Sequence, residues 1–318
     1  VTIVLTGSMA LLHDGVLLLA IVSQVTAPPG DAVTRKPGDL GPPCGSGRGA
    51  PHGATSLGVA GSKHYDRGVA PAQIFSVIIP TLQRSRELHE LVELCAVHPT
   101  VLEVIVVNNH PDPLDFRYEN VRVLQQERNI YVNPAWNLGA REARAEFLAI
   151  INDDVLFDPV VLDIAADFVV KPRRGILALH GKFINQEQAA PSKIRIAGSD
   201  LVGLSFGMFM CLRRENYVPI PEDLKVWGGD DWLFFHQPWP NWALMGPRVR
   251  SEVSVTSSEG QFQQMLGEES SRAQEYVRDM YGSRWWHRPV DALVALRVAR
   301  GRVKEAAARW RTRTRPGG

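Results

Sequence analysis

The chain of 318 residues has little of what marks disulfide-rich, zinc-binding or nucleic-acid-binding proteins. It contains only three cysteines, Cys44, Cys95 and Cys211, which lie far apart. This spacing fits neither a zinc site nor a disulfide framework, and it suits a reducing compartment. The net charge is only +1, which removes the general electrostatic argument for nucleic-acid binding.

Long hydrophobic runs are also missing. The most apolar stretch, residues 9–25, is interrupted by His13, Asp14 and Gly15, and its unbroken part, 16–22, is shorter than the roughly 20 residues that span a bilayer. No Lys or Arg precedes Arg35, so the cationic start of a secretory signal is absent. We therefore expect a cytoplasmic location, and a targeting signal in this stretch is the alternative.

The first part of the chain has no periodicity of either helix or strand. Glycine and proline crowd residues 27–60, and such a segment buries too little apolar surface to offset the entropy lost on ordering. We expect a disordered leader over residues 1–72. The alternative is that these residues come from a start codon placed too far upstream.

From residue 73 onward, short apolar runs alternate with helical patterns. The runs 75–80, 101–107, 121–124 and 147–151 predict buried strands, and 88–95 and 134–145 predict helices. Further strands are expected at 175–180 and 207–212, and a turn followed by a helix within 222–235. This alternation predicts one α/β domain over 73–287, with a mostly parallel sheet flanked by helices on both faces.

Polar residues follow the ends of three of these strands: Thr81, the pair Asn108–Asn109, and the run Asn152–Asp153–Asp154. Ligands of such sheets bind beyond the carboxyl ends of the strands, so these side chains should line one crevice. The adjacent carboxylates repel each other unless a cation is present, which favours magnesium or manganese. The alternative is that Asp154 or Asp158 caps a helix beginning near Pro159.

A second acidic pair, Asp230–Asp231, follows two glycines in residues 227–232 and precedes an apolar helical run. A carboxylate at the start of a helix can point into a cleft and act as a general base. The positive end of the helix dipole is expected to keep Asp231 ionised near neutral pH. The alternative is an aspartate that caps a surface helix.

Taken together, these motifs resemble the family 2 glycosyltransferases, which have the GT-A fold, over residues 75–235. The resemblance implies nucleotide-sugar contacts and a metal motif, and the residues that match the nucleotide-sugar contacts are Pro80, Thr81, Asn108, Asn109, Asn137, Asn152, Asp153 and Gly207. Asn129, Gly139, Ala143 and Glu146 also match the family's spacing before the metal motif.

The resemblance implies inverting transfer of a hexose from a nucleoside diphosphate sugar to an acceptor hydroxyl. Asp154, with Asp153, would hold Mn²⁺ or Mg²⁺, and Asp231, beside Asp230, would be the catalytic base. The implied acceptor is a glycan or a lipid-linked sugar of a cell-envelope polysaccharide. The sequence departs from the family at Asn152 and Asp230, where Asp and Glu are usual, and it lacks the metal-binding His. These departures leave the strictness of metal dependence open.

Two alternatives to this function remain. A sugar nucleotidyltransferase is expected to carry a glycine-rich basic loop after the first strand, and residues 80–85 contain no glycine. A catalytically inactive GT-A-like module used for binding or scaffolding is the other alternative.

The last segment, residues 288–318, is strongly basic. It holds nine Arg or Lys residues against Asp291 and Glu305, a net charge of +7. Leu293, Leu296, Ala299 and Val303 recur at helical spacing, so a basic amphipathic helix is expected. Such a tail favours peripheral contact with an anionic membrane at its inner face. The alternatives are a nucleic acid, for which the rest of the chain gives no support, a partner protein, or packing on the domain.

Overall fold

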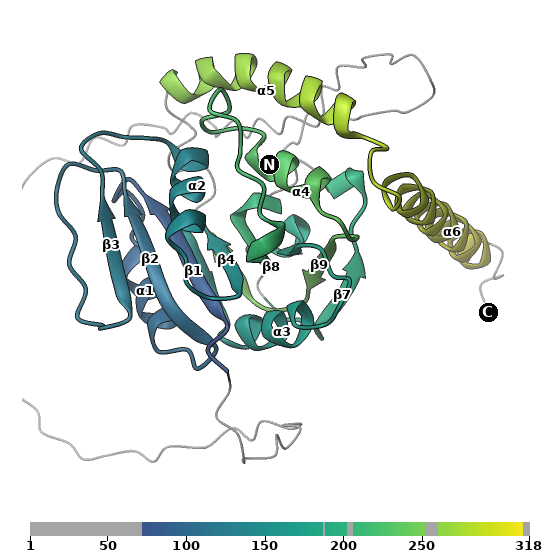
Figure 1. Cartoon of the computed structure of the whole chain (residues 1–318). Helices are drawn as coiled ribbons and strands as arrows, with labels where there is room; N and C mark the ends of the chain where they lie inside the picture. The colour runs from purple at the N-terminus through teal and green to yellow at the C-terminus, as the bar shows by residue number, and fades with distance from the viewer. Residues whose placement is uncertain (1–71, 187, 202–205, 252–259, 314–318) are drawn as a thin grey trace, which may run out of the picture. The chain divides into compact units, whose positions relative to one another are not determined.

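The computed structural model describes residues 72–186, 188–201, 206–251 and 260–313 (Figure 1). The predicted leader, 1–72, lies outside these ranges except for its last residue, and residues 314–318 of the predicted tail lie outside them as well. The division of the chain at residues 72 and 287 stays a prediction.

The central sheet has eight strands in the order β3-β2-β1-β4-β8-β6-β9-β7. Its parallel half consists of β1 (Phe75–Thr81), β2 (Val101–Asn108), β3 (Val121–Gln125) and β4 (Phe147–Ile151). In the other half, β8 (Phe209–Arg213) runs antiparallel to both β4 and β6 (Leu177–Leu179), and β9 (Trp242–Met245) pairs parallel to β6 and antiparallel to β7 (Lys193–Ile196). The predicted mostly parallel α/β sheet is therefore confirmed.

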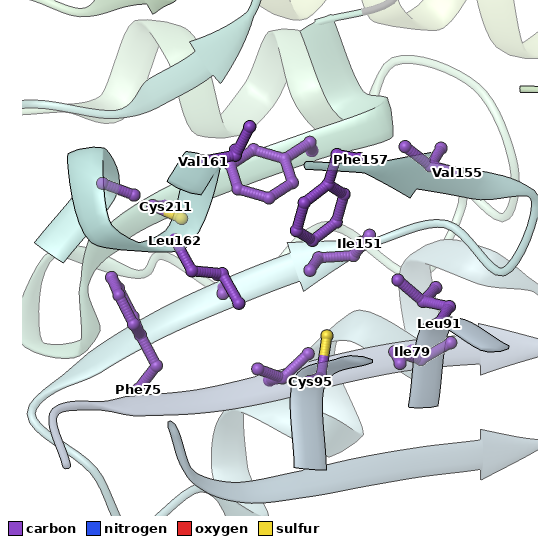
Figure 2. Packing of buried hydrophobic residues seen from close by; sticks show 14 of the residues in the cluster. Phe75, Ile79, Leu91, Cys95, Ile151, Val155, Phe157, Val161, Leu162 and Cys211 are labelled. Atoms are coloured by element: carbon purple, nitrogen blue, oxygen red, sulfur yellow. The ribbon is translucent and has the colours of Figure 1, made fainter. Parts of the chain in front are cut away.

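Alternate residues of the strands point to opposite sides of the sheet, so the sheet has two apolar faces. Helices cover both of them. On one face, Val77 and Ile79 of β1 pack with α1 (Leu88–Ala96) and α3 (Val160–Val169) (Figure 2). On the other, Ile78 packs with residues of α2 (Val132–Glu142) and α4 (Gly229–His236). Two apolar layers thus fix the sheet between its helices.

Cys95 of α1 and Cys211 of β8 belong to the first of these layers (Figure 2). Both are fully buried free thiols, and burial raises the pKa of each. The expectation that these two cysteines form no disulfide agrees with the structure.

Some elements differ from the sequence prediction or were not predicted. Helix α2 begins at Val132 and ends at Glu142, where the extended Ala143 stops it, whereas 134–145 was expected. Gly207, expected in a strand, lies in the short 3-10 segment η3 (Phe206–Met208) before β8. Other short helical segments are η1 (Gly181–Phe183), η2 (Ser199–Leu201) and η4 (Arg214–Asn216), and β5 (Val155–Phe157) pairs with β10 (Val249–Ser251).

Two long helices follow the sheet, α5 (Gly260–Met280) and α6 (His287–Arg313). Helix α6 contacts the domain through Val290, through Val294 and through Asp291, which accepts hydrogen bonds from the backbone N–H and the hydroxyl of Ser199 at 2.8 and 2.7 Å. The predicted apolar stripe of α6, Leu293, Leu296, Ala299 and Val303, is exposed. No helix in the described ranges is long and apolar enough to cross a membrane.

Candidate active site

The carboxyl ends of β1, β2 and β4 meet, as predicted. The Thr81 hydroxyl donates to Asp153 Oδ2 at 2.6 Å, and the backbone N–H of Asn109 donates to Thr81 O at 2.8 Å. Because parallel strands end at the same edge of a sheet, residues 81, 109 and 153 come together although they lie up to 72 positions apart.

The two asparagines at the end of β2, Asn108 in the strand and Asn109 just after it, are buried and hold the surrounding loops. Asn108 Nδ2 donates to Gln125 Oε1 at 2.7 Å and to Asp112 O at 2.8 Å, and Asn109 Oδ1 accepts from Ile130 N–H at 3.3 Å. Gln83 donates from its side chain to Asn108 Oδ1 and from its backbone to the Thr81 hydroxyl oxygen. These bonds give the crevice a fixed wall, and contact of the asparagines with a nucleotide stays a prediction.

The Asn152–Asp153–Asp154 run follows β4 and is half-buried. Burial raises the pKa of Asp153 to about 6, with a further rise from the charge of Asp154, while the Thr81 hydrogen bond opposes the shift. Asp154 Oδ2 accepts from the Ser251 hydroxyl at 3.1 Å. The helix-capping alternative applies to Asp158, whose Oδ1 accepts from Val160 N–H at 3.0 Å.

The side-chain oxygens of Asn152, Asp153 and Asp154 fit a hard cation in part. The charges that raise the pKa of Asp153 are those of Asp154 and Glu87, both negative, and Asn152 Oδ1 is buried without a hydrogen-bond partner among the described residues. Within those residues, no group of three or more His, Cys, Asp or Glu side chains could hold a metal. Two carboxylates would therefore need further oxygens from a ligand to complete the coordination of a metal.

The second acidic pair lies in the first turn of α4. Gly228 precedes the helix with φ 73°, a left-handed conformation that favours glycine. Asp230 Oδ2 accepts from Gly207 N–H at 3.1 Å, and a Cβ on Gly207 would lie 2.9 Å from Asp230 Cβ. Gly228, and neither aspartate, occupies the N-cap position of α4, while the Asp230 carboxyl group accepts from backbone N–H groups of the first turn. The expected alternative, an aspartate at the N-cap, is therefore not found.

Burial works against the expected ionisation of Asp231 at the start of α4. Burial, and next the charge of Asp230, raise the pKa of Asp231 well above its ordinary value. Burial also raises the pKa of Asp230, although three backbone N–H groups act against the rise. Asp231 Oδ1 is buried without a hydrogen-bond partner among the described residues. Desolvation thus outweighs the helix dipole here.

The segment η3 connects the two acidic sites. Gly207 donates its N–H to Asp230, and the carbonyl of the next residue, Met208, accepts from Asn152 N–H at 3.0 Å. The pair after β4 and the pair on α4 therefore flank the same three-residue segment, which places both acidic sites at one edge of the sheet.

Two further predicted residues have structural contacts. Pro80 is buried within β1. The Asn137 amide bonds Ile220 through both its oxygen and its nitrogen, at 2.9 Å each, and its oxygen also accepts from the Tyr217 hydroxyl at 2.8 Å. Asn137 therefore ties α2 to the loop after η4, and a role in donor binding stays a prediction.

Comparison with known proteins gives a match to one protein family. A family model described as "Glycosyl transferase family 2" matches residues 76–218. Among solved structures, TarS 1-349 of S. aureus in complex with UDP-GlcNAc is 17% identical with a TM-score of 0.47, and covers 65% of this chain and 71% of its own.

A second solved structure, S. aureus TarS, is 19% identical with a TM-score of 0.42, over 67% of this chain and 46% of that one. This chain therefore spans less than half the length of that TarS chain. A search of curated protein sequences found no match. Residues 76–218, from β1 to the loop after η4, match the model of glycosyl transferase family 2.

Proposed function

We propose that this chain is an inverting glycosyltransferase that moves a hexose from a nucleoside diphosphate sugar to an acceptor hydroxyl. The observation that carries the proposal is the position of η3 between the two acidic sites, bonded to Asn152 on one side and to Asp230 on the other. A donor bound beyond β4 would then lie next to the carboxyl group of Asp231.

In the proposed reaction, Asp231 takes the proton of the acceptor hydroxyl, and the acceptor oxygen forms a bond to the anomeric carbon. The bond from that carbon to the diphosphate breaks, and the nucleoside diphosphate leaves with the electron pair. Attack from the face opposite the leaving group inverts the configuration. Asp230, held by Gly207 N–H, keeps the first turn of α4 in place beside the reacting atoms.

Asp153 and Asp154 are the residues that would hold a divalent cation. Such a cation would neutralise the diphosphate and stabilise it as a leaving group. The Thr81 hydroxyl keeps Asp153 oriented, since it donates to Oδ2 at 2.6 Å. Thr81, Asn108 and Asn109 would line the nucleotide pocket, and Gly207 would lie beside the sugar.

We further propose that the acceptor is a glycan or a lipid-linked sugar of the cell envelope, and that the protein acts in the cytoplasm near the inner face of the membrane. The support is the exposed face of α6, where Leu293, Leu296 and Val303 lie among Arg297, Arg300 and Lys304. Basic helices with exposed apolar residues bind anionic membrane surfaces.

A panel of UDP-, GDP- and TDP-hexoses, each with and without Mn²⁺, tests the proposal in two steps. A donor that binds the native state raises the melting temperature, and an enzyme hydrolyses that donor slowly without an acceptor. Binding without any hydrolysis or transfer would instead favour the inactive GT-A-like module. Release of pyrophosphate from a nucleoside triphosphate and a sugar phosphate would favour the nucleotidyltransferase.

A further inference from the structure

Glu269 of α5 is a buried acid that contacts the chain just before the Asp230–Asp231 pair. Its side chain is only 4% exposed, and its Oε2 accepts hydrogen bonds from the backbone N–H groups of Val226 and Trp227, each at 2.8 Å. Two donors on one oxygen fix the path of the backbone two residues before the start of α4. A buried acid is costly unless such hydrogen bonds compensate it.

Ala273 and Tyr276, four and seven positions after Glu269, lie on the same side of α5 as Glu269. They contact this region at two more points. A Cβ on Gly228 would lie 2.4 Å from Ala273 Cβ, so the backbone runs directly against Ala273. The Tyr276 hydroxyl donates to the Asp223 carboxyl group, and the Tyr276 ring meets Trp232 edge-on at 5.2 Å. Helix α5 therefore contacts the chain on both sides of the acidic pair.

Helix α2 holds the same segment through its first turn. Asn133 donates its backbone N–H to Lys225 O at 3.0 Å and its side-chain Nδ2 to Leu224 O at 3.1 Å. Residues 224–227 thus have hydrogen bonds to α2 through carbonyl groups and to α5 through N–H groups. Of these contacts, only Glu269 supplies a buried side-chain acceptor to two successive N–H groups.

We propose that Glu269 is a positioning residue for the acidic pair on α4. It fixes residues 226–227, and through them the start of α4 and the direction of the Asp231 carboxyl group. Small displacements of a catalytic group lower the rate strongly, so this support is expected to act on turnover more than on donor binding. The proposal rests on the proposed function of Asp231, and α5 lies outside the segment matched by the family model.

The test uses the full chain with Glu269→Ala, Glu269→Asp and Glu269→Gln, and with Glu268→Ala as the matched control, because Glu268 is exposed on the same helix. Turnover is measured with the member of the UDP-, GDP- and TDP-hexose panel that the parent chain uses. We expect Glu269→Ala to lower kcat at least tenfold, with the KM for the donor changed less than twofold. Glu269→Gln keeps an acceptor oxygen and should recover most of the rate, and Glu268→Ala should match the parent.

Two readouts separate positioning from a general loss of stability. In Glu269→Ala, the acidic limb of the pH profile should move to lower pH, because a looser first turn of α4 admits water to Asp231. Amide hydrogen exchange of Val226 and Trp227 should accelerate while the amides of β1 and β4 stay protected. If Glu269→Ala does not fold, Glu269→Asp, which withdraws the oxygen by one methylene, should show the same pattern in weaker form.

Parental kcat and pH profile in a folded Glu269→Ala or Glu269→Asp would overturn the proposal, and so would unchanged exchange at residues 226 and 227. If the parent chain turns over no donor in the panel, the proposed function fails. The exchange experiment still decides separately whether Glu269 fixes the loop.

Discussion

At the residue scale, Asp231 is the group on which the proposed chemistry depends. Asp231→Asn keeps the shape of the side chain and removes its basicity. We expect transfer to fall by about a hundredfold or more, the usual scale for loss of a general base. Donor affinity should change little, because the base contacts the acceptor. Steady-state kinetics and donor titration measure the two effects.

Asp230→Asn is the control for this variant. Asp230 accepts a hydrogen bond from Gly207 N–H, which the amide oxygen of asparagine can also accept, so its effect should be milder. If Asp230→Asn is the inactive variant, the two aspartates exchange roles. Parental transfer rates in both variants would remove this pair from the mechanism.

The raised pKa of Asp231 also predicts the pH dependence of the reaction. A base acts only when deprotonated, so activity is lost as pH falls through the raised pKa of the acidic pair. The acidic limb of kcat/KM should therefore lie clearly above the ordinary aspartate pKa of about 3.9. A limb at or below that value would show that the pair is solvated and ionised in the active enzyme.

Asp154 is tested through binding. Asp154→Ala should abolish the Mn²⁺-dependent rise in melting temperature that a nucleoside diphosphate produces, because the link between protein and phosphate is lost. Asp158→Ala is the matched control, because it removes a hydrogen bond at the start of α3. It should lower the free energy of unfolding by about 1 kcal/mol, and with it the melting temperature, equally with and without metal. Undiminished Mn²⁺ dependence in Asp154→Ala would exclude Asp154 as a ligand.

The residues that the sequence could identify are those that follow an apolar strand or a glycine pair, such as Thr81, Asp153 and Asp231. Their position after a strand or before a helix is a local pattern. Glu269 could not be found this way, because its partners are backbone N–H groups 42 and 43 positions away. Gln83 has no sequence signal either, since its positive φ of 56° is unusual for a residue other than glycine.

At the scale of elements, β1, β2 and β4 were predictable because buried strands read as continuous apolar runs. Strand β3 was expected to be buried as well, but its residues are half-buried or exposed. The short strands β5 and β10, of three residues each, are stabilised by pairing with each other, and three residues show no periodicity. Helix α5 is rich in polar and charged residues, so only its tertiary contacts reveal its role. Gly207 reads as part of strand β8, yet its contact with Asp230 places it in η3.

Helix α6 exposes both apolar and basic side chains, and this combination predicts salt-sensitive binding to anionic vesicles. Neutralising Arg297, Arg300 and Lys304 should weaken binding on the order of a hundredfold, because each basic residue near such a surface contributes about 1 kcal/mol. Vesicle co-sedimentation at low and high salt measures the effect.

The control for the α6 variant neutralises exposed arginines elsewhere, Arg117, Arg141 and Arg278. Comparable losses in the two triple variants would mean that binding depends on net charge alone. Unchanged binding of the α6 variant would exclude this helix as the membrane contact.

At the scale of the whole molecule, the two acidic sites come from different parts of the chain. The segment that the family model matches ends at residue 218 and contains the carboxylates after β4, while the pair on α4 lies beyond it. The proposed site is therefore complete only when the later helices pack on the sheet. Stability of that packing and turnover should be linked.

The buried thiols of Cys95 and Cys211 give a direct way to follow that packing. Both side chains are 0% exposed, so a thiol reagent reaches them only when the core between sheet and helices opens. With Cys44→Ser, native protein should react on the order of a thousandfold more slowly than denatured protein, and a bound donor should slow labelling further. Rapid native labelling would contradict the packing described. The core thus contains its own reporter of opening, which needs no introduced cysteine and no knowledge of the substrate.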